Sequence, residues 1–285
     1  MRAMGESIAD RFTKDGFCFP VPIMAAQEAA EWRARLEDIE HRYAVPESLP
    51  RPLNNYLRVN AHIVLPIACQ LASDPRILGA VKEILGPDIL IWSVEFFTKE
   101  AGTHKIVSWH QDLTYWGIGA TDDEVTAWLA LSPATPESGC MRFIPGSHRH
   151  DLLPHQDSFA KDNLLSRGQE IAVDVDEADA VCAELKPGEI SLHHGRLFHA
   201  SGPNASNDRR IGCAIRYITP KVKQTVAKHD YAMPALGSGD TGSFTPITGP
   251  KAEFDAASIA LYEKVLADQS AAMSQGSDQD LSLYS

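Results

Sequence analysis

The stretch Trp109-His110-Gln111-Asp112-Leu113-Thr114-Tyr115-Trp116 is the most informative part of this chain. On an extended strand successive side chains point to opposite faces. His110 and Asp112 therefore project to the same side and can bind one ion, while Gln111 points away. His-x-Asp pairs also arise by chance, so the pair alone is weak evidence, and the interpretation depends on what the rest of the chain supplies.

A second histidine stands much later, in the run His199-Ala200-Ser201-Gly202-Pro203-Asn204, and Arg210 follows it. If the fold brings His199 from a distant strand to His110 and Asp112, two imidazoles and one carboxylate occupy one face of a metal. The opposite coordination positions stay open. This ligand set favours non-haem Fe(II) used for oxygen chemistry. We therefore predict a metal site of His110, Asp112 and His199.

From residue 89 onward the chain consists of short β-like segments separated by Gly, Pro, Asn and Asp. Many short strands indicate a sandwich or barrel. A ligand set drawn from distant strands favours a mainly β fold with flanking helices and a jelly-roll core (a cupin-like double-stranded β-helix), because the mouth of such a core holds a metal and small molecules. The predicted strands are 89–99, 105–110, 125–132, 141–144, 189–193 and 211–218.

The first part of the chain is predicted to be helical and to brace one side of this core. Residues 5–45 have a helical composition, with apolar residues at helical spacing between Ala25 and Tyr43, and a Pro-rich stretch ends this region. Asp74-Pro75 offers an N-cap and a first-turn proline for a helix that closes at Leu85-Gly86-Pro87. We predict one catalytic domain over residues 1–270 and a flexible tail over 271–285, which is rich in Ser, Gln, Asp and Gly.

Four blocks of sequence, in order, resemble the phytanoyl-CoA dioxygenase family of Fe(II)- and 2-oxoglutarate-dependent oxygenases. The resemblance covers roughly residues 8–220 and implies the jelly-roll fold, with Fe(II), 2-oxoglutarate as co-substrate, and O2. The blocks are 109–116, Ala127-Trp128-Leu129-Ala130-Leu131, Gly139-Cys140-Met141-Arg142-Phe143-Ile144-Pro145-Gly146-Ser147-His148, and the His199 run through Arg210.

The resemblance also implies a cationic anchor for the distal carboxylate of 2-oxoglutarate. Arg210 stands at the family position, and a guanidinium gives a planar, permanently charged and bidentate contact. Arg209 is the competing assignment. Strand parity favours Arg210, because Arg210 shares a face with the small residues Gly212 and Ala214.

Further residues are assigned to the walls of the site. Ser201 is a candidate for a hydrogen bond to the same co-substrate, and Trp128 stands at the family position that helps to wall its binding site. Tyr115 and Trp116 are candidates for the substrate wall. Plain core packing is the alternative for all three aromatic residues.

By resemblance, the reaction decarboxylates 2-oxoglutarate to succinate and CO2 and hydroxylates an unactivated C–H bond of a small organic substrate. Related halogenases replace the carboxylate ligand with a small residue, whereas this chain keeps Asp112, which favours hydroxylation. Desaturation, epimerisation and cyclisation remain alternatives. A non-catalytic metal-binding jelly-roll protein is the alternative of another class, but such a binder needs no carboxylate anchor like Arg210.

Composition limits the partners. The net charge of −12, from 38 acidic and 26 basic residues, repels a phosphate backbone, so no nucleic-acid partner is expected. It also disfavours a coenzyme A thioester as substrate, unless a local basic patch of Arg51, Arg58, Arg142 and Arg149 overcomes it.

The five cysteines form an odd set without a Cys-x-x-Cys pair, which indicates neither disulfides nor a zinc knuckle. No signal segment and no apolar run of about 18 residues is present, so we expect a cytoplasmic protein without a membrane partner. The oligomeric state stays open.

The other histidines receive structural assignments. His193 and His194 close a predicted strand, but a ligand role for either would leave the His199 run without a function. His148, in the Pro-Gly-Ser-His turn, is assigned either a structural role or an indirect role beside the metal ligands. For His62 and His104, a place at the substrate entrance and a place on the surface both stay open.

Overall fold

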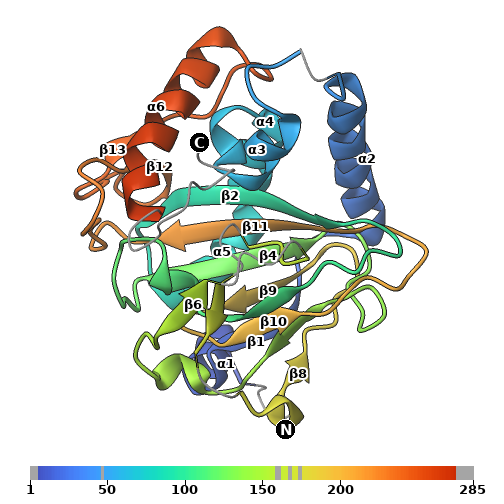
Figure 1. The fold of residues 1–285 in the computed structure, drawn as a ribbon. Coiled ribbons are helices and arrows are strands. Elements are labelled where there is room, and N and C mark those ends of the chain that lie inside the picture. The colour runs from blue at the N-terminus through green and yellow to red at the C-terminus, as the bar shows by residue number, and fades with distance from the viewer. Residues whose placement is uncertain (1–5, 46–47, 158–161, 166–168, 173–174, 274–285) are drawn as a thin grey trace, which may run out of the picture.

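Two sheets form the core of the computed structural model, which describes residues 6–45, 48–157, 162–165, 169–172 and 175–273 (Figure 1). The major sheet has the order β1 (Phe17–Pro22), β9 (Glu189–His193), β4 (Glu124–Ala130), β11 (Arg210–Ile218), β2 (Ile89–Lys99), β12 (Tyr231–Leu236), β13 (Thr245–Pro246). The minor sheet has the order β3 (Val107–His110), β10 (His199–Ser201), β5 (Met141–Phe143), β8 (Val181–Cys182). Apart from the β12–β13 pair, the strands in both sheets pair antiparallel, which confirms the predicted jelly roll. A separate hairpin of β6 (His155–Asp157) and β7 (Gln169–Ile171) lies beside β3.

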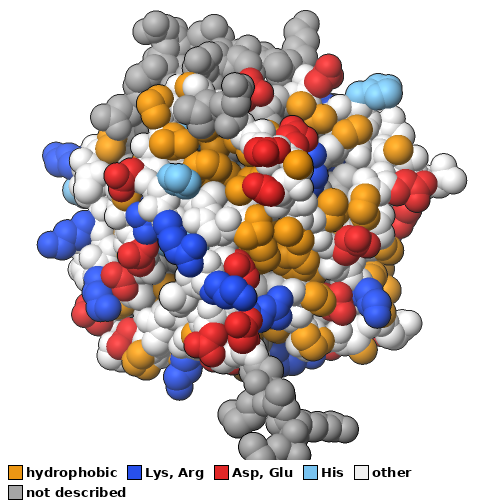
Figure 2. Space-filling model, turned by 90° about the horizontal axis from the view of Figure 1, so that it is seen from below, with side chains coloured by type: hydrophobic (Ala, Val, Ile, Leu, Met, Phe, Trp, Pro, Cys, Tyr) orange, Lys and Arg blue, Asp and Glu red, His pale blue; other side chains and the backbone are white. Residues whose placement is uncertain are grey.

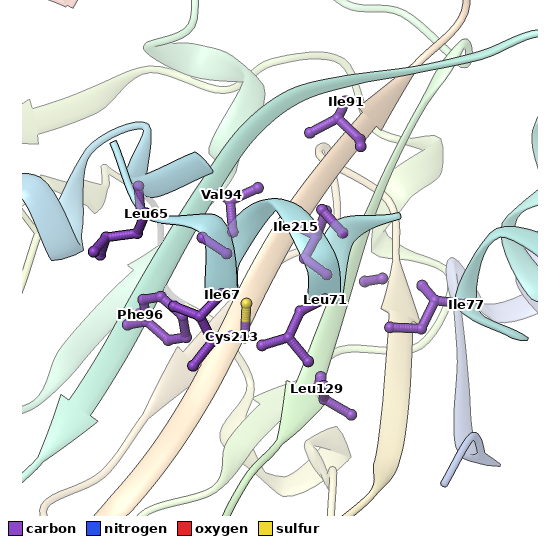
Figure 3. Packing of buried hydrophobic residues seen from close by; sticks show 14 of the residues in the cluster. Leu65, Ile67, Leu71, Ile77, Ile91, Val94, Phe96, Leu129, Cys213 and Ile215 are labelled. Carbon is purple, nitrogen blue, oxygen red and sulfur yellow. The ribbon is translucent and has the colours of Figure 1, made fainter. Parts of the chain in front are cut away.

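Helices cover the face of the major sheet that points away from the minor sheet (Figure 1). Their bounds are α1 (Ile8–Asp15), α2 (Ala26–Arg42), α3 (Leu53–Arg58), α4 (Pro66–Ala72), α5 (Pro75–Leu85) and α6 (Ala256–Met273). Leu71 of α4 packs against Cys213 and Ile215 of β11, and Phe96 of β2 lies in the same cluster (Figure 3). This contact removes the apolar face of β11 from water, which is the main source of stability for such a layer.

The two faces of β11 differ as the alternation predicts. Ile211, Cys213, Ile215 and Tyr217 belong to the large apolar cluster under the helices. Arg210, Ala214 and Arg216, on the other face, line a cavity between the two sheets. The strand therefore separates a packed core on one side from a binding site on the other.

The prediction of one helical region over residues 5–45 is wrong. α1 ends at Gly16, whose φ of 84° is left-handed, and the chain then forms β1 before α2 begins. β1 contains Pro20 and Pro22, and proline is tolerated at the edge of a sheet, where β1 lies. The helix at Asp74-Pro75 is confirmed, with the Asp74 side chain accepting from the Arg76 amide at 2.8 Å.

The sequence interpretation also missed α3, α4 and α6. α6 runs to Met273, three residues into the predicted tail, and residues 274–285 lie outside the described part of the chain. Within the described residues, no helix combines the length and the apolar character needed to cross a bilayer. On the molecular face in Figure 2, basic and acidic side chains are interspersed around apolar ones.

Candidate active site

The three predicted metal ligands converge at one end of the minor sheet. β10 pairs with β3 so that His199 and His110 are register partners, and their ring centroids lie 4.0 Å apart. β3 ends at His110, and an extended Gln111 carries the chain into a 3-10 turn that begins at Asp112. The Asp112 Oδ1 atom lies 3.3 Å from His110 Nε2 and 4.0 Å from His199 Nε2. All three ligand atoms lie within 4.8 Å of one another, and all three residues are buried.

The ring orientations fit a metal between them. The Nδ1 atom of His110 faces the carbonyl oxygen of Ser108 at 2.9 Å, and that of His199 faces the carbonyl oxygen of Leu197 at 3.0 Å. A carbonyl oxygen only accepts, so each Nδ1 carries the proton and each Nε2 offers a lone pair. The three ligand atoms lie close enough together to contact a single metal ion, and imidazole and carboxylate donors suit ferrous iron.

Gln111 anchors the loop between two of these residues. It is fully buried, and its side chain points away from the metal site. Its amide nitrogen donates to the carbonyl oxygens of Arg196 (2.9 Å) and Asp151 (3.3 Å), and its amide oxygen accepts from the Leu153 amide (2.9 Å). These bonds fix the turn that presents Asp112.

The electrostatics favour the protonation states that a divalent metal needs. Burial opposes the charge of Asp112, but the adjacent imidazoles of His110 and His199 hold the pKa of the carboxyl group well below its ordinary value. Burial, together with repulsion from His110, lowers the pKa of His199 to about 4. At neutral pH the carboxylate is ionised and the His199 imidazole is neutral, as metal ligands must be.

Arg210 lies in the cavity and Arg209 lies outside it. Arg210 is 2% exposed, donates from Nη1 to the Gly139 carbonyl at 2.9 Å, and its buried Nε has no hydrogen-bond partner in the described structure. Arg209 instead pairs with Glu40 at 2.8 Å and with Glu100 at 3.1 Å. Of these two neighbouring arginines, only Arg210 lines the cavity.

Trp128 and Gly212 shape the wall beside this arginine. The Arg210 guanidinium carbon lies 5.2 Å from the centroid of the Trp128 ring. A Cβ atom on Gly212 would lie 1.9 Å from Cζ2 of the same ring, so a side chain at residue 212 would displace Trp128. Trp128 lines the cavity and also packs in an apolar cluster.

Ser201 lines the cavity next to Arg210 and contacts a buried lysine, Lys99, that the sequence did not identify as a site residue. The Lys99 Nζ atom donates to Ser201 Oγ at 2.7 Å, to the Ser201 carbonyl at 3.3 Å and to the Gly202 carbonyl. The Ser201 hydroxyl therefore accepts from Lys99 and keeps its own hydrogen for another acceptor.

The cavity has an empty volume of about 920 Å³, including its solvent-filled mouth. Tyr115 and Trp116 both line it, as the substrate-wall assignment requires. Beside them Arg216 pairs with Glu95 at 2.8 Å, and the Arg216 guanidinium carbon lies 4.8 Å from the Trp116 ring centroid. This end of the cavity is therefore polar as well as aromatic.

Several lining residues escaped the sequence interpretation: Arg58, Glu95, Phe97, Thr126, Met141, Leu165, His193 and Arg216. Glu95 alternates with the apolar residues Val94 and Phe96 along β2, but this alternation alone does not distinguish an inward polar site from a face exposed to solvent. Of the four arginines named as a possible basic patch, Arg51 pairs with Glu263 and Arg142 with Glu177, whereas Arg58 lines the cavity.

The remaining histidines do not belong to the group of three ligands. His193 lines the cavity, with its ring centroid 5.1 Å from that of His199. His194 instead contacts Asp122 at 3.0 Å, and His148 contacts the Thr13 carbonyl at 3.2 Å, in keeping with the structural role. His62 is 1% exposed, so neither the entrance nor the surface place is right for it, while His104 is exposed.

Comparisons with known proteins agree with this geometry. The solved structure of the non-heme monooxygenase ThoJ, in its apo form, superposes with a TM-score of 0.85 at 35% identity, over 94% of this chain and 98% of that chain. A probable alpha-ketoglutarate-dependent hypophosphite dioxygenase of Stutzerimonas stutzeri is 27% identical, over 65% of this chain and 61% of the relative. An ectoine dioxygenase of Sphingopyxis alaskensis is 26% identical, over 73% of this chain and 74% of the relative.

The chain spans less than two thirds of the length of the first curated relatives, with 61%, 51% and 52% covered. The family model described as phytanoyl-CoA dioxygenase matches residues 12–212, a range that holds all three candidate ligands, Ser201 and Arg210. The chain belongs to the phytanoyl-CoA dioxygenase family.

Proposed function

We propose that this protein is an Fe(II)- and 2-oxoglutarate-dependent dioxygenase that hydroxylates an unactivated C–H bond of a small organic substrate. The convergence of His110, Asp112 and His199 on one face of a cavity, with Arg210 on the wall of that cavity, carries the proposal. The chemistry of the donor set fits a ferrous ion, because three protein ligands leave positions open for a bidentate co-substrate and for O2. When these groups are bound, they supply the oxidising power, and 2-oxoglutarate leaves as succinate and CO2.

The residues of the chain hold the metal, orient the co-substrate and close one side of the site. The Nε2 atoms of His110 and His199 and a carboxylate oxygen of Asp112 hold the metal, with the imidazoles fixed by their Nδ1 hydrogen bonds. Arg210 and Ser201 bind the distal carboxylate of the co-substrate, and Trp128 closes that side. A buried arginine with an unpartnered Nε is suited to this role, because a bound carboxylate supplies the acceptor that the free site lacks.

The other end of the cavity receives the primary substrate. Tyr115 and Trp116 give it aromatic walls, while the Glu95–Arg216 ion pair gives it hydrogen-bonding groups. A plain hydrocarbon chain here would cover these charged groups without satisfying them, at a cost in free energy. We therefore propose a polar small molecule as the substrate. The five free thiols fit a reducing compartment such as the cytoplasm.

The test is succinate release by the Fe(II)-reconstituted protein with 2-oxoglutarate and O2, measured against a panel of polar small molecules. We expect His110→Ala and Asp112→Ala to abolish the release and His104→Ala, at an exposed histidine, to leave it intact. Wild-type protein that binds metal but releases no succinate with any compound would support the non-catalytic alternative. The product mass separates hydroxylation, which adds one oxygen, from desaturation, epimerisation and cyclisation.

A further inference from the structure

Two buried cations lie directly opposite each other beside the cavity: Arg210 lines it, and Lys99 contacts Ser201, which also lines it. Lys99 is the last residue of β2 and Arg210 is the first of β11, and the two are register partners, so their side chains leave the same face of the sheet. Lys99 is 1% exposed and Arg210 is 2% exposed. Like charges at directly opposed positions repel each other, and burial increases the cost. This pair therefore requires a compensating anion.

The described residues around the pair do not supply that anion. The ionisable groups that act on Lys99 are Arg210, Arg142 and the Cys140 thiol, and those that act on Arg210 are Cys140 and Arg58. Burial raises the pKa of Cys140 to about 12, so this thiol is neutral. Among the described residues, no carboxylate forms an ion pair with either cation. A dicarboxylate at Arg210 would provide the missing negative charge.

The contacts of Lys99 place it behind Ser201. Its Nζ atom has three oxygen neighbours, namely Ser201 Oγ at 2.7 Å, the Ser201 carbonyl at 3.3 Å and the Gly202 carbonyl. An ammonium group has three N–H donors and satisfies all three, whereas a neutral amine has only two. The contacts therefore favour the charged form of Lys99. They also turn the Ser201 hydroxyl hydrogen toward the cavity.

Burial and the charge of Arg210 act in the opposite direction. Together they lower the pKa of Lys99 to about 6. Without a bound anion, the amine is thus mostly neutral at neutral pH, even though its three oxygen neighbours suit an ammonium group. The protonation state of this residue is balanced closely enough for a nearby negative charge to change it.

We propose that Lys99 is a positioning residue for the co-substrate and takes up one proton from solvent when the distal carboxylate of 2-oxoglutarate binds to Arg210 and Ser201. This inference rests on the proposed function, because that function identifies the dicarboxylate. The ammonium then donates to Ser201 Oγ and the serine donates to the carboxylate, so the charge of Lys99 acts through the hydroxyl. On release of the dicarboxylate, the proton returns to solvent.

The proposal predicts that the Kd for 2-oxoglutarate depends on pH. In the free protein Lys99 loses its proton as pH rises through about 6, whereas in the complex it keeps the proton to a higher pH. Above about pH 6, binding therefore requires proton uptake, and Kd rises by up to about tenfold per pH unit. Below that pH, Lys99 is already charged and Kd no longer depends on it.

The experiment is titration calorimetry of 2-oxoglutarate into Mn(II)-loaded protein at about pH 7.5, in two buffers with different ionisation enthalpies. The difference in heat gives the number of protons taken up, and we expect about one per co-substrate for wild type. Lys99→Met should abolish the uptake and weaken binding about tenfold or more. Lys99→Arg, with a permanent charge, should bind without uptake. Lys82→Met, at an exposed lysine on α5, is the matched control and should behave as wild type.

The outcomes separate the two proposals. No binding of 2-oxoglutarate to the Mn(II)-loaded wild type would refute the proposed function itself. Binding without proton uptake, or with uptake unchanged in Lys99→Met, would overturn the role of Lys99 and leave the function standing. If Lys99→Met does not fold, two measurements on the wild type test the proposal: the number of protons taken up, and the Kd for 2-oxoglutarate as a function of pH. A Kd that is flat from about pH 6 to pH 8 contradicts the proposal.

Discussion

Replacing Arg210 with methionine separates co-substrate binding from folding. Each hydrogen bond between the guanidinium and a carboxylate contributes about 1.5–3 kcal/mol, so loss of a bidentate contact should weaken 2-oxoglutarate binding by about 3–4 kcal/mol, or 10²- to 10³-fold in Kd. Arg210 is buried without an acidic partner, and burial lowers its pKa to about 10. The free protein therefore gains little from this charge, and the free energy of unfolding should fall by less than about 1 kcal/mol.

Arg209→Met is the matched comparison at the neighbouring position. It removes the pairs with Glu40 and Glu100, which are partly exposed, so we expect a stability loss of about 1 kcal/mol and an unchanged Kd. The assay is calorimetric titration of Mn(II)-loaded protein with 2-oxoglutarate, together with urea denaturation of both variants. A larger rise in Kd for Arg209→Met than for Arg210→Met would refute the assignment of the anchor.

Three further predictions concern the scaffold. His62 is buried, neither ring nitrogen has a partner in the described structure, and burial lowers its pKa to about 3, so the unfolded chain takes up a proton first as pH falls below about 6.5. Between pH 7 and pH 5, wild type should thus lose about 2 kcal/mol more unfolding free energy than His62→Leu, and equal losses in urea melts would contradict this. Gly212→Ala forces Trp128 to move and should cost about 1–3 kcal/mol and raise the Kd for 2-oxoglutarate, whereas Gly79→Ala, in open space on α5, should be neutral or stabilising. The same cost in both glycine variants would argue against the close contact at residue 212. Asp74→Ala should lower the free energy of unfolding by about 1 kcal/mol through loss of the cap on α5, and an unchanged thermal midpoint would count against that role.

Local pattern predicts the long strands and the helix with clear caps. β2 and β9 have the predicted bounds, because β2 is rich in apolar residues, β9 alternates apolar Ile190 and Leu192 with polar residues, and turn signals bound both. β1 escaped prediction since its prolines suggest a loop, and only its pairing with β9 makes it a strand. β10 has three residues, too few for a periodic signal, and a prediction from sequence rests on His199 alone. α6 does have apolar Ile259, Tyr262 and Leu266 at helical spacing, a signal that was available.

The residues of the candidate site also fall into two groups: those that the sequence indicates and those that only the folded structure identifies. Its metal ligands stand in short motifs with a fixed chemical meaning, so residue types and spacing indicate them. Glu95, Lys99 and Arg216 stand in strands without a motif, and a charged residue in a strand usually faces solvent. Their importance depends on tertiary structure, because register pairing places Lys99 opposite Arg210 and brings Glu95 near Arg216. The sequence places Arg216 on the same face as Arg210 but does not identify its partner.

The most direct test is anaerobic titration of the Fe(II)-loaded protein with 2-oxoglutarate, followed by visible absorption. If His110, Asp112 and His199 hold one ferrous ion with adjacent open positions, a weak charge-transfer band should appear and saturate at one co-substrate per protein. The band should be absent in His199→Ala. Wild-type protein without this band, or a band of full intensity in His199→Ala, would contradict the account.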